Sequence, residues 1–101
     1  PRGQSFRNRK PSFRVVIHRL NRYIQNHPLS DERMHARVEA GLTRAQENLA
    51  KMRAIRENCR TAGVAVEQCM REVRPIVRDT RRLLHRIIMA VRSDRRKTRG
   101  R

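Results

Sequence analysis

Aromatic side chains are scarce in this sequence, which holds one Tyr, two Phe and no Trp among 101 residues. Proteins that hold single-stranded nucleic acid commonly stack successive bases on aromatic rings, and rows of such rings are absent here. No apolar run approaches the roughly 20 residues that a membrane-spanning helix needs. We therefore expect neither a single-strand binder built on stacked rings nor a membrane protein.

The residue types that carry catalysis and metal binding are also few. The two cysteines, Cys59 and Cys69, are separated by nine residues. We expect them to be small apolar residues on buried helix faces, because no histidine is spaced around them as a metal ligand. No Gly-rich phosphate loop, paired carboxylates in an apolar setting or nucleophile beside a base can be recognised. The sequence predicts no enzymatic activity, no metal, no cofactor and no small-molecule substrate.

Positive charge is what the chain has in excess. Against 26 Lys and Arg stand 9 Asp and Glu, which gives a formal net charge of +17. The only lysines are Lys10, Lys51 and Lys97, so nearly all of this charge is on guanidinium groups. Guanidinium groups bind phosphate in a bidentate manner and enter narrow minor grooves. These features favour a nucleic acid backbone as the partner.

The N-terminal half of the chain predicts a basic tail and two helices. Residues 1–11 are basic without an acid, and Ser12 can cap a helix that ends near His27, before Pro28. Ser30 can cap a second helix, with two acids in its first turn. Apolar residues then recur at steps of three and four and predict one continuous helix of nearly 30 residues, ending at Gly63. This stripe comprises Met34, Val38, Leu42, Ala45, Leu49, Met52, Ile55 and Cys59.

The C-terminal third predicts two further helices separated near Pro75. A brief helix with Cys69, Met70 and Val73 inward should end or kink at this proline, which can also stand in the first turn of a last helix. That last helix carries the most apolar face of the chain, and residues 92–101 look like a basic tail. The predicted organisation is a tail at 1–11, a three-helix unit at 12–77, a C-terminal helix at 78–91 and a tail at 92–101.

The order of medium, long and short helices, together with particular residues, resembles the core histones, and histone two-B most of all. Arg9 to Leu20, running on to His27-Pro28, is similar to the start of the histone two-B core. Met34 falls on the methionine that opens the long helix of that family. Arg60-Thr61 lies within one position of the basic-hydroxyl motif in its second loop, and Val73-Arg74 falls on the Val-Arg of its third helix.

The chain also departs from histone two-B in its later helices. The long helix has smaller apolar residues, including Gly41 and Ala45, than the family uses. Where histone two-B places glutamates of the acidic docking patch, this sequence has Thr80 and Ile88 among arginines. Such an arginine-dominated form is closer to a giant-virus histone than to a conventional one.

The resemblance implies an all-α histone fold with an additional C-terminal helix and basic tails. It implies a heterodimer with a histone two-A-type chain, association with the other core histones, and wrapping of duplex DNA in a nucleosome-like particle in the nucleus or a virion. In that fold two long helices cross, and the expected dimer interface is Val38, Leu42, Ala45, Leu49, Met52 and Ile55. Backbone N–H groups at converging helix starts meet phosphates, and arginines enter the minor groove. The expected DNA contacts are Arg9, Lys10, Arg14, Ser30, Arg33, Arg60 and Thr61.

Two other functions fit the composition. Small, basic, helical chains are common as RNA scaffolds in ribosomes, and the spacing of Cys59 and Cys69 would suit a mitochondrial one. A viral nucleocapsid protein that condenses a genome as a helical homodimer is the other alternative.

Overall fold

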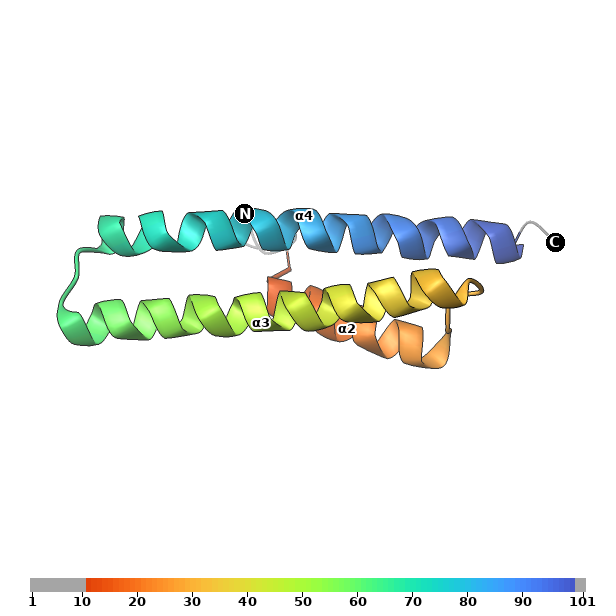
Figure 1. Ribbon diagram of the computed structural model, residues 1–101, viewed down its shortest axis with the longest axis horizontal. Helices are drawn as coiled ribbons and strands as arrows, with labels where there is room; N and C mark the ends of the chain where they lie inside the picture. The colour runs from red at the N-terminus through yellow and green to blue at the C-terminus, as the bar shows by residue number, and fades with distance from the viewer. Residues whose placement is uncertain (1–10, 100–101) are drawn as a thin grey trace, which may run out of the picture.

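The computed structural model describes residues 11–99, and all of its regular structure is helical. Helix α2 spans Phe13–Asn26, α3 spans Glu32–Ala62 and α4 spans Val66–Arg99. The long helices α3 and α4 run antiparallel as a hairpin, and the shorter α2 lies against the part of this hairpin that is remote from its turn (Figure 1). The all-α class predicted from the sequence is confirmed. No helix within residues 11–99 has the length and apolar character needed to cross a membrane.

The helix ends follow from local side-chain chemistry. Ser12 caps α2 by accepting a hydrogen bond from the Val15 amide at 3.4 Å. Asp31 caps α3 and accepts from the amides of Arg33 and Met34, at 2.9 and 3.3 Å. Gly63 ends α3 in the left-handed conformation, with φ of 68°, which a residue without a Cβ adopts at little cost. The ends predicted near His27 and at Gly63 are confirmed, whereas the cap of α3 is Asp31 rather than Ser30.

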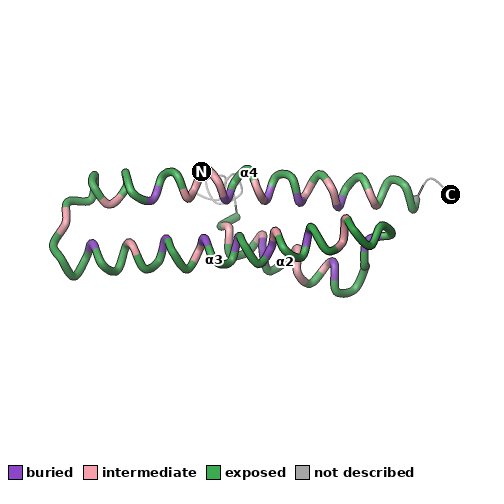
Figure 2. The backbone as a smooth tube through the Cα atoms, viewed as in Figure 1, coloured by how far each residue is buried: buried purple, intermediate pink, exposed green. Residues whose placement is uncertain are grey.

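The core lies between α2, α3 and α4 within the single chain. Its buried residues come from one face of each helix and from the loop before α3, and they appear as the purple segments where the three helices meet (Figure 2). Gly41 permits a close approach of the long helices, since a Cβ there would lie 3.0 Å from Cδ1 of Ile87. The buried residues of this core are Ile17, Ile24, Leu29, Val38, Leu42, Ala45, Leu84, Ile87 and Val91.

One polar contact fixes how α3 and α4 align. Asn48 is buried on α3, and its side-chain amide donates to Thr80 Oγ1 at 3.1 Å and to Asp79 Oδ2 at 3.0 Å. The Thr80 hydroxyl in turn donates to the Ile76 carbonyl at 2.7 Å. Sliding either helix by one turn would leave the buried Asn48 amide without these partners, which costs roughly 1–3 kcal/mol. The contact therefore selects one register of the hairpin.

The expectation of two helices separated at Pro75 was wrong, because α4 passes through this proline without a break. Val73 before the proline and Thr80 after it are both buried, so one face of α4 continues across it. The packing of this face along the whole of α3 outweighs the roughly 3 kcal/mol that an interior proline costs a helix.

Residues 92–99 continue α4 as well, where a basic tail was predicted. Asp94 attaches this segment to the loop before α3. Its Oδ1 accepts a hydrogen bond from the Ser30 amide at 3.0 Å and one from the Ser30 hydroxyl at 2.5 Å. The guanidinium of Arg95 lies 5.7 Å from the centre of the Tyr23 ring. The end of α4 is thus attached both to α2 and to the loop that follows it.

Replacing Pro75 by Ala should stabilise the protein by about 1–3 kcal/mol, because the substitution restores a backbone donor inside a continuous helix. Urea denaturation of P75A and of the unchanged chain measures this difference. An unchanged or lower free energy of unfolding would mean that the helix is interrupted at this position.

Replacing Asp94 by Ala should lower the free energy of unfolding by about 1–2 kcal/mol, because two hydrogen bonds to a carboxylate are lost. Amide hydrogen exchange over residues 92–98 should become faster, while exchange around Asn48 stays the same. D94N, which keeps an acceptor oxygen, is the control and should have a smaller effect. Equal exchange in D94A and the unchanged chain would refute the attachment.

Candidate nucleic-acid interface

The solvent-facing side of α4 is a row of arginines. Positions 71, 74, 78, 82, 92 and 96 recur at steps that place them on one side of a helix, opposite the buried face that includes Thr80 and Leu84. Every one of these side chains is exposed. Between the first and last of them the helix rises by roughly 37 Å at 1.5 Å per residue. We call this row the α4 arginine face: Arg71, Arg74, Arg78, Arg82, Arg92 and Arg96.

Two acids of α4, Asp79 and Asp94, lie away from this face, whereas Glu67, one turn before Arg71, lies on the same side of the helix as the arginines. The Asp79 carboxylate accepts from Asn48 and forms an ion pair with Arg44 at 3.4 Å, both on α3. The Asp94 carboxylate is bound by Ser30. Residues 72, 79 and 94 share one flank of the helix by their spacing, so Glu72 lies on the same flank. Intrachain contacts thus hold the Asp79 carboxylate against α3 and the Asp94 carboxylate against the loop before α3, and no acid lies on the α4 arginine face between residues 71 and 96.

The solvent side of α3 differs, because its charges are mixed. Glu39, Glu47 and Glu57 are interspersed with basic residues, and Arg60 forms an ion pair with Glu57. His35 lies 3.6 Å from Glu39. A polyanion would thus meet weaker net attraction on α3 than on α4.

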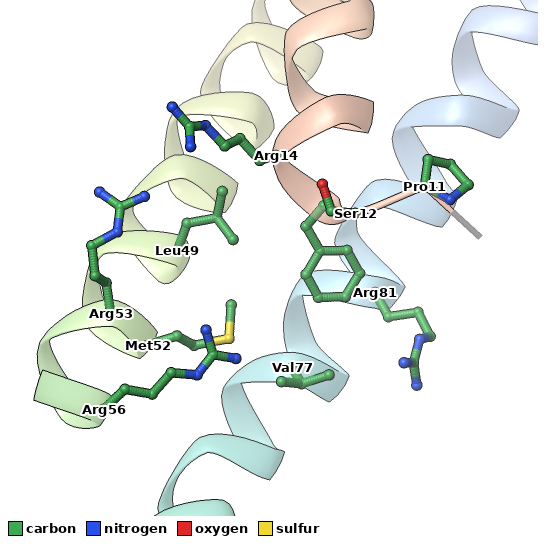
Figure 3. A pocket seen from close by; sticks show the side chains of 10 residues that line it. Pro11, Ser12, Arg14, Leu49, Met52, Arg53, Arg56, Val77 and Arg81 are labelled. Atoms are coloured by element: carbon green, nitrogen blue, oxygen red, sulfur yellow. The ribbon is translucent and has the colours of Figure 1, made fainter. Parts of the chain in front are cut away.

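A groove of about 480 Å³ opens beside the start of α2, where this helix meets the hairpin. Arginines from all three helices surround it, and the apolar side chains of Leu49, Met52 and Val77 lie between them (Figure 3). Pro11, Ser12 and Phe13 complete the lining, which includes no acidic residue. We call this the four-arginine groove, after Arg14, Arg53, Arg56 and Arg81.

The DNA contacts predicted from the sequence are dispersed over the structure. Arg14 is exposed in the first turn of α2 and lines the four-arginine groove. Ser30 precedes α3, and Arg33 is exposed in the first turn of that helix. Arg60 and Thr61 are at the opposite end of α3, with the Thr61 hydroxyl donating to the Asn58 carbonyl at 3.0 Å. The single chain therefore does not bring its two loops together, and Arg9 and Lys10 lie outside the described residues.

The residues predicted to form a dimer interface are used within the chain itself. Val38, Leu42 and Ala45 belong to the three-helix core, and Met52 is also buried. Leu49 and Ile55 are half-buried. The expectation that the α3 stripe needs a second chain to cover it is therefore corrected, because α4 folds back along α3 and covers most of it.

Sequence reasoning missed the contribution of Arg53, Arg56 and Arg81 to a shared groove. Nothing in the spacing of Arg53 and Arg56 along the long helix indicates that the start of α2 lies beside them. The α4 arginine face could have been recognised from spacing alone if residues 66–99 had been taken as one helix.

The two cysteines face each other across the end of the hairpin. Cys59 is buried, Cys69 is half-buried, and both are free thiols. A hydrogen bond with Cys69, together with burial and the nearby negative charges of Cys69 and Glu72, raises the pKa of Cys59 from 9.0 to about 11. Cys59 therefore remains a neutral thiol at physiological pH, which makes it a poor nucleophile. Within residues 11–99, no three His, Cys, Asp or Glu side chains lie close enough together to hold a metal ion.

Comparison with known proteins identifies no relative: no family model, curated protein or solved structure matches this chain.

Proposed function

We propose that this protein is a structural, non-catalytic nucleic-acid-binding protein that holds the sugar-phosphate backbone, with duplex DNA as its principal ligand. The observation that carries the proposal is the distribution of charge on α4: Asp79 is bound by α3 and Asp94 by the loop before it, and between residues 71 and 96 the solvent side holds arginines and no acid. A helix with one arginine-lined side offers a series of bidentate phosphate donors. Backbone contacts of this kind carry little sequence information, so binding should have weak sequence preference.

The four-arginine groove extends this basic surface to a second side of α4. Arg81 is on the groove side of the helix, and Arg78 and Arg82, its neighbours in sequence, belong to the α4 arginine face. Arg14 joins them from the start of α2, where free backbone N–H groups and the helix dipole also attract anions. A backbone bound along α4 can therefore contact arginines from more than one helix.

The likeness of the first helix to histone two-B suggests a more specific form of this function. In that form the chain adopts a histone fold with a histone two-A-type partner and wraps duplex DNA together with the other core histones, in chromatin or a virion. Such a pair needs the α3 stripe to be accessible, so the part of α4 beyond Pro75 would have to leave α3. The exposed proline inside α4 is the natural place for this opening, because the helix already lacks a backbone hydrogen bond there.

An RNA scaffold, such as a ribosomal protein, is the second candidate function. The observation that favours it is the core within the single chain, which buries Val38, Leu42 and Ala45 without a partner. A chain that folds by itself can bind to folded RNA through its basic sides with no second histone-fold subunit.

Removing two charges from the α4 arginine face should weaken binding more than removing two from α3. The affinity of R78Q/R82Q for a 20-bp DNA duplex is measured by fluorescence anisotropy at several salt concentrations. The plot of log K against log salt concentration should be less steep by about 2, because two phosphate contacts are lost. R37Q/K51Q removes equal charge from the mixed side of α3 and is the matched control. Equal slopes for the two variants would refute α4 as the binding side.

Nuclease digestion separates the two candidate functions. The histone-like form predicts that co-expression with a histone two-A-type chain gives a stable pair, and that the reconstituted DNA complex yields protected fragments of defined length. The RNA scaffold predicts that the chain alone is a cooperatively folded monomer, prefers folded RNA to duplex DNA and protects no such fragments.

A further inference from the structure

The four-arginine groove differs from the α4 arginine face because it has an apolar floor. Leu49 and Met52 of α3 and Val77 of α4 lie between the arginines, and Phe13 also lines the groove (Figure 3). A ligand that contacts only the rim would leave the half-buried side chains of Phe13, Leu49 and Val77 partly facing water. Full complementarity therefore requires a ligand that joins an anionic group to a flat or apolar one.

The size of the groove restricts the ligand further. Its volume of about 480 Å³ falls within the range of sites that enclose a small organic group. The bases of an intact duplex are stacked and paired inside the helix, so a duplex presents mainly phosphates and sugars to such a groove. An unpaired nucleotide can place its base on the floor while its phosphates reach the rim, as single-strand binders commonly do.

The rim suits the phosphates of such a nucleotide. Arg53 and Arg56 are exposed on neighbouring turns of α3, and Arg81, also exposed, lines the opposite edge from α4. Guanidinium planes also stack on nucleobases, so the same side chains can contact either part of the ligand.

We propose that the four-arginine groove is a binding site for one unpaired nucleotide of a nucleic acid strand, with its base on the half-buried Phe13, Leu49 and Val77 and its phosphates on the surrounding arginines. This inference rests on the proposed function and adds to it a site that distinguishes unpaired strands and ends from continuous duplex.

The first test compares two labelled DNA probes by fluorescence anisotropy at one salt concentration: a blunt 20-bp duplex, and the same duplex with a three-nucleotide single-stranded overhang. The overhang should increase affinity by about tenfold, as expected for one inserted base. R53Q/R56Q should abolish this preference. R78Q/R82Q removes equal charge from the α4 arginine face and should weaken both probes while preserving their ratio.

The second test needs no variant and asks whether the base is recognised. Adenosine 5′-monophosphate should displace the overhang probe at a concentration about tenfold lower than ribose 5-phosphate, which carries the phosphate without the base. Both competitors have the same charge, so simple screening affects them equally.

The outcomes separate this site from the general proposal. If both probes bind equally tightly, or ribose 5-phosphate competes as well as the nucleotide, the groove is only a phosphate-binding patch. Backbone binding as a function then survives and the nucleotide site is refuted. Failure of the chain to bind any of the nucleic acids would refute the proposed function itself.

Discussion

Burial of a narrow apolar stripe on α3 by the facing side of α4 is the interaction on which this structure depends. The stripe is sparse and includes Gly41 and Ala45, so it gains buried area only where the partner helix comes very close. Ile87 occupies the space that a larger residue at position 41 would fill. The close approach then obliges Asn48 to find a partner on α4, and Thr80 and Asp79 provide it. Packing and polar pairing thus select the same register.

The large positive charge acts against this arrangement and is also the basis of the function that we propose. A compact chain with a net charge of +17 repels itself, and α4 carries much of that charge. Asp79 and Asp94 reduce the repulsion at contacts of α4 with α3 and with the loop before it. These carboxylates share one flank of α4, and arginines occupy its solvent side between residues 71 and 96, so the acids that hold the hairpin together do not lie among the arginines proposed to bind phosphate.

The sequence predicts the bounds of the first helix, whereas the packing of the helices decides what covers the α3 stripe. The first helix, with its Ser12 cap and its end before Pro28, depends on local residues, and both the sequence and the structure give it nearly the same bounds. The α3 stripe can be covered either by the apolar face of the chain's own α4 or by that of another subunit, and the two compete for it. In the single chain α4 is always present at high effective concentration, because a turn of only three residues joins it to α3. A partner would have to compete with that intrachain contact.

The sequence by itself determined the all-helical class, the length of α3 and the left-handed end at Gly63, because these follow from periodicity and capping. Its composition led to the proposal of a polyanionic partner. Only the tertiary structure decided that α4 is continuous through Pro75, that residues 92–99 are helical and that four arginines from three helices share a groove. Each of these depends on contacts between residues far apart in the chain, such as Ser30 with Asp94 and Asn48 with Thr80. Local propensity assigns Pro75 a penalty, and only the packing of the whole helix against α3 shows that this penalty is outweighed.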